Sequence, residues 1–86
     1  MYQIKLNKTL YEYLMNILVD TTIKEHIFSI KDTDGVSIQL DVDTKLELME
    51  YVEDKQLEIG FVNQDYLNED GKKLQEIYDA LYYQTN

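Results

Sequence analysis

Two aspartates that could bind a metal lie close together in the middle of the chain. Asp41 and Asp43, in the stretch "DVD", are two positions apart at the end of a predicted strand, so both carboxylates would project from one face. Such a pair can hold Mg²⁺ or transfer protons in a hydrolysis. Two carboxylates fill little of the octahedral oxygen shell that Mg²⁺ requires. A metal-dependent hydrolase using Asp41 and Asp43 is therefore only an alternative hypothesis, and we expect no metal and no cofactor.

The only histidine does not complete a second catalytic group. His26 alternates with Phe28 and Ile30, which places it on the apolar face of a predicted strand. Ser29 and Ser37 fall on the opposite, polar face of the same hairpin. A catalytic triad needs a nucleophile and an orienting group beside its histidine. We therefore interpret His26 as a structural residue at the edge of the sheet.

Other motifs of enzymes are missing as well. The stretch "DTDG", residues 32–35, contains residue types found in calcium loops, but a predicted strand follows at Val36, where a calcium-binding EF-hand would continue toward a helix. The chain has no cysteine and no arginine, and its glycines, Gly35, Gly60 and Gly71, form no phosphate-binding loop. These absences predict a protein that is not an enzyme.

The charge balance limits the possible partners. Seventeen Asp and Glu face eight Lys, which gives a net charge of −9. Direct binding to nucleic acid or to an anionic membrane needs a cationic surface, so we expect neither. The acidity either keeps the protein soluble or presents a surface to a basic partner. The lack of cysteine and the polar residues that interrupt Met1 to Val19 predict a cytoplasmic protein.

Hydrophobic spacing at the start of the chain predicts a strand and then a helix. Tyr2, Ile4 and Leu6 alternate as they would in a half-buried strand. The helix should begin at an N-cap, Asn7, or at a capping box from Thr9 to Glu12. The apolar positions with helical spacing are Leu10, Leu14, Ile17 and Leu18.

Two alternating stretches in the middle of the chain predict a β-hairpin. Its loop should comprise residues 33–35 and end in a left-handed glycine, Gly35, as in a type I turn with a bulge. This loop sets Ile30 against Ile38, and Phe28 against the next apolar position of the second strand. Directly opposed residues share a face of the sheet, so these side chains should all face the core.

Two further helices are expected after the hairpin. The first should open with a capping box from Thr44 to Glu47 and end at a left-handed Gly60, although 56–62 could instead hold a short strand. The closing helix should begin near Glu69 after the N-cap Asn68. The expected buried positions are Leu46, Met49 and Val52, widened by Leu48, Tyr51 and Ile59, and then Leu74, Ile77, Tyr78 and Leu81.

The predicted order is β-α-β-β-α-α within one domain, residues 1–86. Three short strands with one apolar face need a cover, which the helices supply. We therefore predict a two-layer α+β fold in which helices cover a small, mainly antiparallel three-stranded sheet. A chain of this size builds a modest core, so self-association would add stability.

Tyrosine is the residue type that stands out, because the chain has eight and no tryptophan. The helix that buries Leu74, Ile77 and Leu81 cannot also bury all three of its tyrosines, and one of the pair Tyr11 and Tyr13 should leave the core as well. Tyrosine is enriched in protein interfaces. The candidate interface residues are Tyr78, Asp79, Tyr82 and Tyr83.

Two resemblances bear on the closing segment. "LNEDGKKL", Leu67 to Leu74, resembles the start of the last helix in winged-helix regulators, but the predicted hairpin lies too far upstream, and no DNA contact is implied. "GFVNQDYLNEDGKKLQEIYDALYYQ", Gly60 to Gln84, resembles the C-terminal part of small uncharacterised proteins of phages and prophages of Gram-positive bacteria. That resemblance implies a phage accessory setting in a bacterial host cell and no activity.

The leading hypothesis is a small acidic interaction protein that binds another protein or itself. The first alternative is an acidic mimic of nucleic acid that inhibits a host protein handling DNA or RNA. That alternative requires carboxylates arrayed along one face of the molecule, whereas an even charge distribution would count against it.

Overall fold

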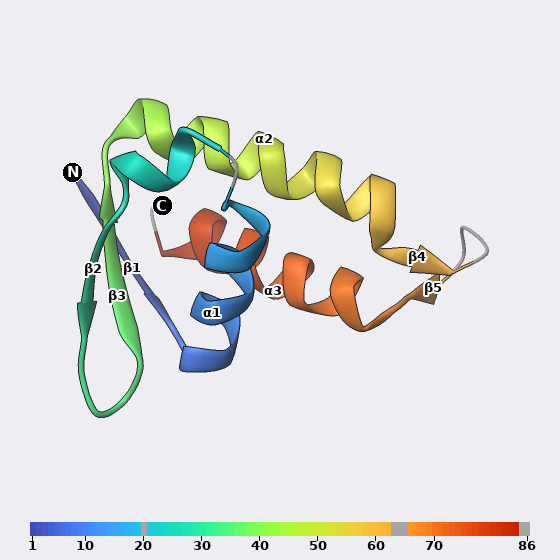
Figure 1. The fold of residues 1–86 in the computed structure, drawn as a ribbon, viewed down its shortest axis with the longest axis horizontal. Coiled ribbons are helices and arrows are strands. Elements are labelled where there is room, and N and C mark those ends of the chain that lie inside the picture. The colour runs from blue at the N-terminus through green and yellow to red at the C-terminus, as the bar shows by residue number, and fades with distance from the viewer. Residues whose placement is uncertain (20, 63–65, 85–86) are drawn as a thin grey trace.

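The computed structural model describes residues 1–19, 21–62 and 66–84 and has the predicted α+β fold (Figure 1). The predicted order of strands and helices is confirmed, and the structure adds a short 3₁₀ helix, η1, and two short strands. The elements are β1 (Tyr2–Leu6), α1 (Lys8–Ile17), η1 (Ile23–His26), β2 (Phe28–Lys31), β3 (Val36–Leu40), α2 (Val42–Ile59), β4 (Phe61–Val62), β5 (Tyr66–Leu67) and α3 (Glu69–Tyr83).

The main sheet is antiparallel, with the strand order β1-β3-β2. Figure 1 shows it nearly edge-on, with the helices on one side. The central pair Ile4 and Ile38 lie opposite each other and are fully buried beneath the helices. The predicted core face of the first strand is confirmed, since Ile4 and Leu6 are buried and Tyr2 is half-buried. The two predicted layers are thus a sheet and a helical cover.

The predicted register of the hairpin is wrong. Ile30 pairs with Ser37 rather than Ile38, and Phe28 pairs with Gln39. Since paired residues share a face, Phe28 and Ile30 point away from the helices and are 63% and 54% exposed. His26, predicted to continue this strand, instead closes η1.

The cause of the shifted register is a loop one residue longer than predicted. The loop spans 32–35, with a hydrogen bond of 2.9 Å from Asp32 N to Gly35 O. The Asp32 side chain also accepts from Asp34 N at 2.8 Å, so it folds the loop locally. Gly35 has a positive φ of 153°, a conformation that side chains rarely adopt, so the predicted need for glycine at the end of the loop is confirmed. A Cβ there would lie 2.5 Å from the carbonyl oxygen of Leu6, so the position requires glycine.

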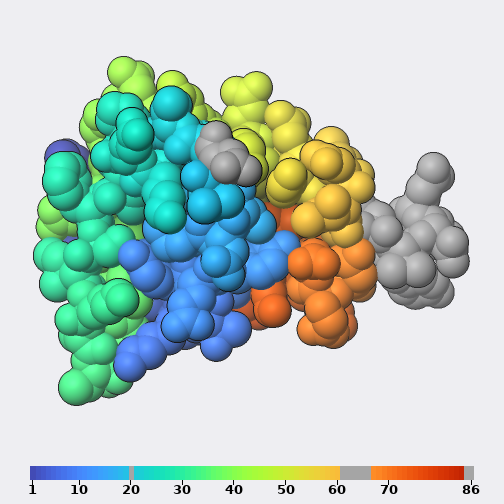
Figure 2. Space-filling view, in the orientation of Figure 1, coloured from blue at the N-terminus to red at the C-terminus, as the bar shows by residue number. Residues whose placement is uncertain are grey.

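The first helix forms as its spacing predicts. Asn7 is the N-cap, and its side chain accepts a hydrogen bond of 2.8 Å from Leu10 N. Leu14 and Leu18 are fully buried under the sheet and Leu10 nearly so. Figure 2 shows α1 (blue) filling the middle of one face, between the sheet and the other two helices.

The second helix begins earlier than predicted and turns a different stripe inward. Asp41 is its N-cap and accepts from Thr44 N at 2.7 Å, so Thr44 lies within the first turn rather than opening a capping box. Leu48 and Val52 are fully buried, but Leu46 is 56% exposed, contrary to prediction.

The end of the second helix also differs from prediction. The helix runs to Ile59, and β4 follows, so both alternatives for 56–62 hold in part. Gly60 caps it with a φ of −89°, which is right-handed rather than left-handed.

β4 and β5 lie between α2 and α3, at the end of the molecule far from the main sheet (Figure 1). β4 and β5 pair as a second antiparallel hairpin. Asn68 anchors it, since its backbone N donates to Gly60 O at 2.9 Å and its side chain donates to Ile59 O at 2.7 Å. This second hairpin directly precedes the last helix, as the hairpin of a winged helix does. The predicted first hairpin, in contrast, lies too far upstream for that resemblance.

The helical cover completes the core. Leu74, Ile77 and Leu81 of α3 pack into one cluster with the apolar face of the sheet. No helix among the described residues is long and apolar enough to cross a membrane.

Candidate functional site

The candidate interface lies on α3, whose inward stripe determines where its tyrosines point. Asn68 caps the helix as predicted, accepting from Gly71 N at 2.8 Å. Leu74, Ile77 and Leu81 are buried, which confirms the predicted stripe. Each helical residue turns about 100° from the one before, so residues just after Leu81 rotate away from the core.

Tyr82 and Tyr83 form an exposed aromatic pair at the end of this helix. Tyr82 is 47% exposed and Tyr83 is 72% exposed. Their ring centroids lie 5.1 Å apart with the planes at 88°, an edge-to-face arrangement. Each ring restricts the other, so part of the entropy cost of fixing these side chains on binding is already met.

The other two candidate residues lie apart from this pair. Tyr78 is half-buried against the core and borders a shallow hollow with Glu53 and Gln56 of α2. Asp79 is also half-buried, and its carboxylate accepts from Gln75 Nε2 at 2.9 Å. The four candidates therefore divide into an exposed pair at the helix end and two residues turned toward the neighbouring helix.

A chain of side-chain amides explains why Asp79 is held in place. Gln56 Nε2 of α2 donates to Gln75 Oε1 at 3.0 Å and to Gly71 O at 3.3 Å. Gln75 then donates to Asp79, so the carboxylate ends a hydrogen-bonded row that ties the two helices together. Nothing in the spacing of Gln56, Gln75 and Asp79 along the sequence predicted these hydrogen bonds.

The end of α3 is fixed by a contact that the sequence did not indicate. Lys5 N donates to Gln84 Oε1 at 2.7 Å, and Gln84 Nε2 donates to Lys5 O at 3.0 Å. The side-chain amide thus bonds β1 as a neighbouring strand would. This bidentate contact anchors the chain next to Tyr82 and Tyr83.

The opposite end of α3 is anchored by another tyrosine. Tyr13 Oη donates to Asp70 Oδ1 at 2.8 Å. Burial, followed by the hydrogen bond and the negative charge of Asp70, raises the pKa of the Tyr13 phenol well above its ordinary value. Tyr11 is half-buried like Tyr13, so the expectation that one of them leaves the core is wrong.

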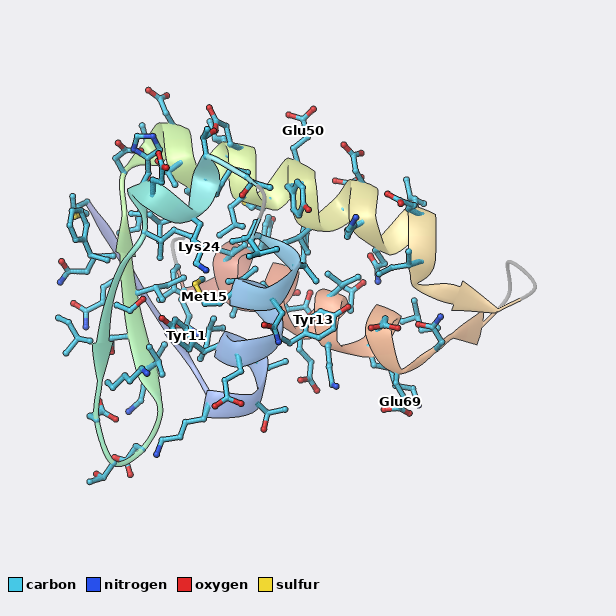
Figure 3. All side chains as sticks on the ribbon, in the orientation of Figure 1. Tyr11, Tyr13, Met15, Lys24, Glu50 and Glu69 are labelled. Carbon is cyan, nitrogen blue, oxygen red and sulfur yellow. The ribbon has the colours of Figure 1, made fainter. Side chains whose placement is uncertain are left out.

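Five of the seventeen acidic residues line up along one helix. The outward face of α2 carries a row of exposed carboxylates, which we call the α2 acidic row: Asp43, Glu47, Glu50, Asp54 and Glu58. They recur every three or four residues, a rise of about 4.5–6 Å from one to the next. Figure 3 shows Glu50 pointing away from the body of the molecule. Lys55 lies 3.7 Å from Glu58, and no other described side chain forms an ion pair with the row.

Asp41 and Asp43, the two aspartates of the metal hypothesis, lie at the start of a helix rather than together on one face of a strand. Asp41 follows β3 and caps α2, so the backbone N–H of Thr44 lowers the pKa of its carboxyl group below the ordinary value. Asp43 lies in the first turn of the same helix and belongs to the α2 acidic row. Among the described residues, no three His, Asp or Glu side chains are grouped as a metal site would require.

Hollows on the surface are shallow and open. The one beside α1 is bordered by Tyr11, Met15 and Lys24, whose side chains are labelled in Figure 3. Another lies where η1 meets α2 and is bordered by Glu50 and Tyr51. Binding sites for small molecules normally bury most of the ligand surface. These two hollows are too shallow to enclose a small substrate in that way.

Comparisons with known proteins add no relative to this description. No protein-family model, no curated protein and no solved structure matches the chain.

Proposed function

We propose that this protein acts without catalysis, by binding another protein through the exposed pair Tyr82 and Tyr83. The observation that carries the proposal is the edge-to-face contact of these two rings on an anchored helix end. Tyrosine supplies a large contact area with few rotatable bonds and a hydroxyl group for a hydrogen bond. A fixed aromatic pair of this kind is typical of residues that dominate binding energy.

The resemblance of Gly60 to Gln84 to phage and prophage proteins suggests where a partner would be found. An accessory protein of this setting works in the cytoplasm of a Gram-positive host and meets host proteins there. The proposal needs no metal, no cofactor and no membrane.

The test is affinity capture from a host lysate with matched variants. The double variant Tyr82→Ser, Tyr83→Ser removes the pair, and Leu46→Ser removes an equally exposed apolar side chain from α2. We expect the wild type and Leu46→Ser to retain the same protein and the tyrosine variant to lose it. Retention by all three chains, or by none, would contradict the proposal.

A second candidate function is favoured by the α2 acidic row. We propose as an alternative that the row imitates a nucleic-acid backbone and binds the basic groove of a host protein that handles DNA or RNA. A line of like charges on one helix presents a directional negative field, unlike acids scattered for solubility.

Charge-neutral substitutions distinguish this alternative from the first proposal. Glu47→Gln, Glu50→Gln and Asp54→Asn together remove three charges from the row and leave both tyrosines in place. If the row binds the partner, capture should weaken in this variant and should fall as salt rises. Capture that is unchanged by the triple variant but lost with the tyrosines would assign binding to α3.

A further inference from the structure

The outer edge of β2 is open, while a side chain covers part of the other edge of the sheet. Gln84 bonds both backbone groups of Lys5 and so occupies the edge of β1. β2 is the last strand in the order β1-β3-β2, and no described residue pairs with its outer side. Figure 2 shows the hairpin (green) at the rim of the molecule. Sheet edges of this kind are templates for pairing with another strand.

The hydrogen bonds of the hairpin determine which peptide groups point outward. Asp32 N donates to Gly35 O, so that pair faces across the hairpin. Antiparallel residues alternate between facing their partner strand and facing away. Ile30 therefore faces β3, whereas the N–H and C=O of Ser29 and of Lys31 point out of the sheet. β1 shows the same alternation. Ser37 turns its backbone groups toward Ile30 of β2, so Lys5, which lies opposite Ser37 on β1, turns its own N–H and C=O out of the sheet.

The outer face of the sheet carries exposed apolar side chains and no carboxylate. Its strand residues are Gln3, Lys5, Phe28, Ile30, Ser37 and Gln39. Phe28 is 63% exposed and Ile30 is 54% exposed, side by side on the edge strand. The three strands contain no acidic residue, and the carboxylate of Asp34 in the loop lies 4.0 Å from Lys5 Nζ on this face, so a second copy meets a surface of low charge.

We propose that a second copy of this chain pairs with β2 in antiparallel fashion, with a two-fold axis at Ser29. The register sets Ser29 against Ser29 of the partner subunit, so that their outward peptide groups bond each other. Phe28 then lies opposite Ile30 of the partner subunit, and Ile30 lies opposite Phe28 of the partner subunit. These two pairs form one row of four apolar side chains on the outer face. The two sheets become one continuous sheet, and the interface is isologous.

Two features select this register and leave the edge accessible. Shifting the axis to Ile30 would set Phe28 against Asp32 of the partner subunit and would leave Ile30 against Ile30 of the partner subunit as the one apolar pair. A lysine on an edge strand often discourages pairing with another chain, because its charge would have to be buried. Here Lys31 Nζ lies 5.9 Å from the centroid of the Tyr11 ring, so the side chain reaches toward α1 instead.

The inference uses a different surface from the proposed function and stands or falls separately. Tyr82 and Tyr83 directly precede Gln84, which bonds Lys5 of β1 at the other edge of the sheet. Salt also separates the two. Each copy carries a net charge of −9, so salt should strengthen self-pairing by screening repulsion, whereas it should weaken binding of a basic partner to the α2 acidic row.

Light scattering of the purified chain at rising concentration tests the pairing. We expect the wild type to approach the mass of two chains, and Ser29→Pro to keep the mass of one. Proline removes the N–H that points to the partner subunit, while the ladder to β3 loses no hydrogen bond. Ile30→Lys, which alters an exposed side chain and no backbone group, is the second variant, and we expect it also to remain a monomer. A wild type that stays monomeric at its highest soluble concentration, or a dimer that survives both substitutions, would overturn the proposal.

Single cysteines test the register, since the natural chain has none. At a two-fold axis the Cα atoms of the opposed residues are about 5.5 Å apart, within reach of a disulfide. Mild oxidation should therefore link Ser29→Cys chains in pairs. Lys31→Cys, two positions from the axis, should stay unlinked. Absence of a link in Ser29→Cys, or equal linking of both variants, would overturn the Ser29 register.

Discussion

The backbones of Gly60 and Gly71 touch where α2 and α3 converge. A Cβ built on Gly60 would lie 2.9 Å from Cα of Gly71, and one built on Gly71 would collide with the carbonyl of Gly60. That carbonyl also accepts from Asn68 N, so it cannot move away without breaking the anchor of the second hairpin. The close approach brings the end of α2 against the start of α3, although residues 60–68 separate the two helices along the chain.

Gly71→Ala should therefore destabilise the protein, although alanine is the better helix former. In an open helix the change would stabilise by about 1 kcal/mol. Here we expect the free energy of unfolding to fall by about 1–3 kcal/mol, as in other overpacked sites. Glu76→Ala, at an exposed position of the same helix, is the control and should change little. Urea denaturation measures both, and a Gly71→Ala chain as stable as the control would show that the connection can relax.

Local pattern predicted the elements but not the faces that they bury. Alternation in β2 identified a strand, yet period two is equally satisfied with Phe28 and Ile30 inward or outward. In the structure the loop spans 32–35, the Asp32 side chain accepts from Asp34 N within it, and the resulting register turns Phe28 and Ile30 outward. Likewise, helical spacing identified α2, but its N-cap at Asp41 rather than Thr44 accompanies an exposed Leu46.

The site could be predicted only in part. Because helical geometry is local, the apolar stripe of α3 indicated that not all of its tyrosines could be buried, and the structure exposes Tyr82 and Tyr83. The contacts that hold this surface are between distant parts of the chain. Gln84 and Lys5 are 79 positions apart, and a glutamine near a chain end has no local signature of such a partner.

Gln84 should protect the edge of β1, since its amide bonds both backbone groups of Lys5. In Gln84→Ala we expect the amide hydrogen of Lys5 to exchange faster and the protein to lose about 1 kcal/mol of stability. Gln84→Glu should act similarly, because a carboxylate cannot donate to Lys5 O. The amide of Ile4, which lies toward β3 in the ladder, is the internal control. Unchanged exchange at Lys5 in both variants would mean that the contact does not persist in solution.

Asp41 should make the start of α2 sensitive to acid. The backbone N–H of Thr44 holds the pKa of the Asp41 carboxyl group below its ordinary value of 3.8, so folding favours the charged form. The resulting stabilisation is present above 3.8 and is lost as the pH falls through the lowered pKa of the folded state. Asp41→Asn keeps a capping oxygen but removes the titration, so its melting temperature should fall less than that of the wild type in acid. Equal acid sensitivity of the two chains would assign the effect to other carboxylates.

Tyr13 should produce the opposite sensitivity, in alkali. Its phenol donates to Asp70 and is partly buried, which raises its pKa above the ordinary value of 10.0. A raised pKa in the folded state contributes stability that is full below 10.0, and that stability is lost as the pH rises from there toward the raised value. Tyr13→Phe lacks the titrating group, so its stability should vary less with pH in this range. At neutral pH the variant should lose about 1 kcal/mol, because Asp70 loses its donor. Tyr83→Phe, which changes an exposed ring, is the control. Thermal unfolding from neutral to alkaline pH measures both variants, and the melting temperature should depend less on pH in Tyr13→Phe than in Tyr83→Phe if the Tyr13 contact joins α1 to α3.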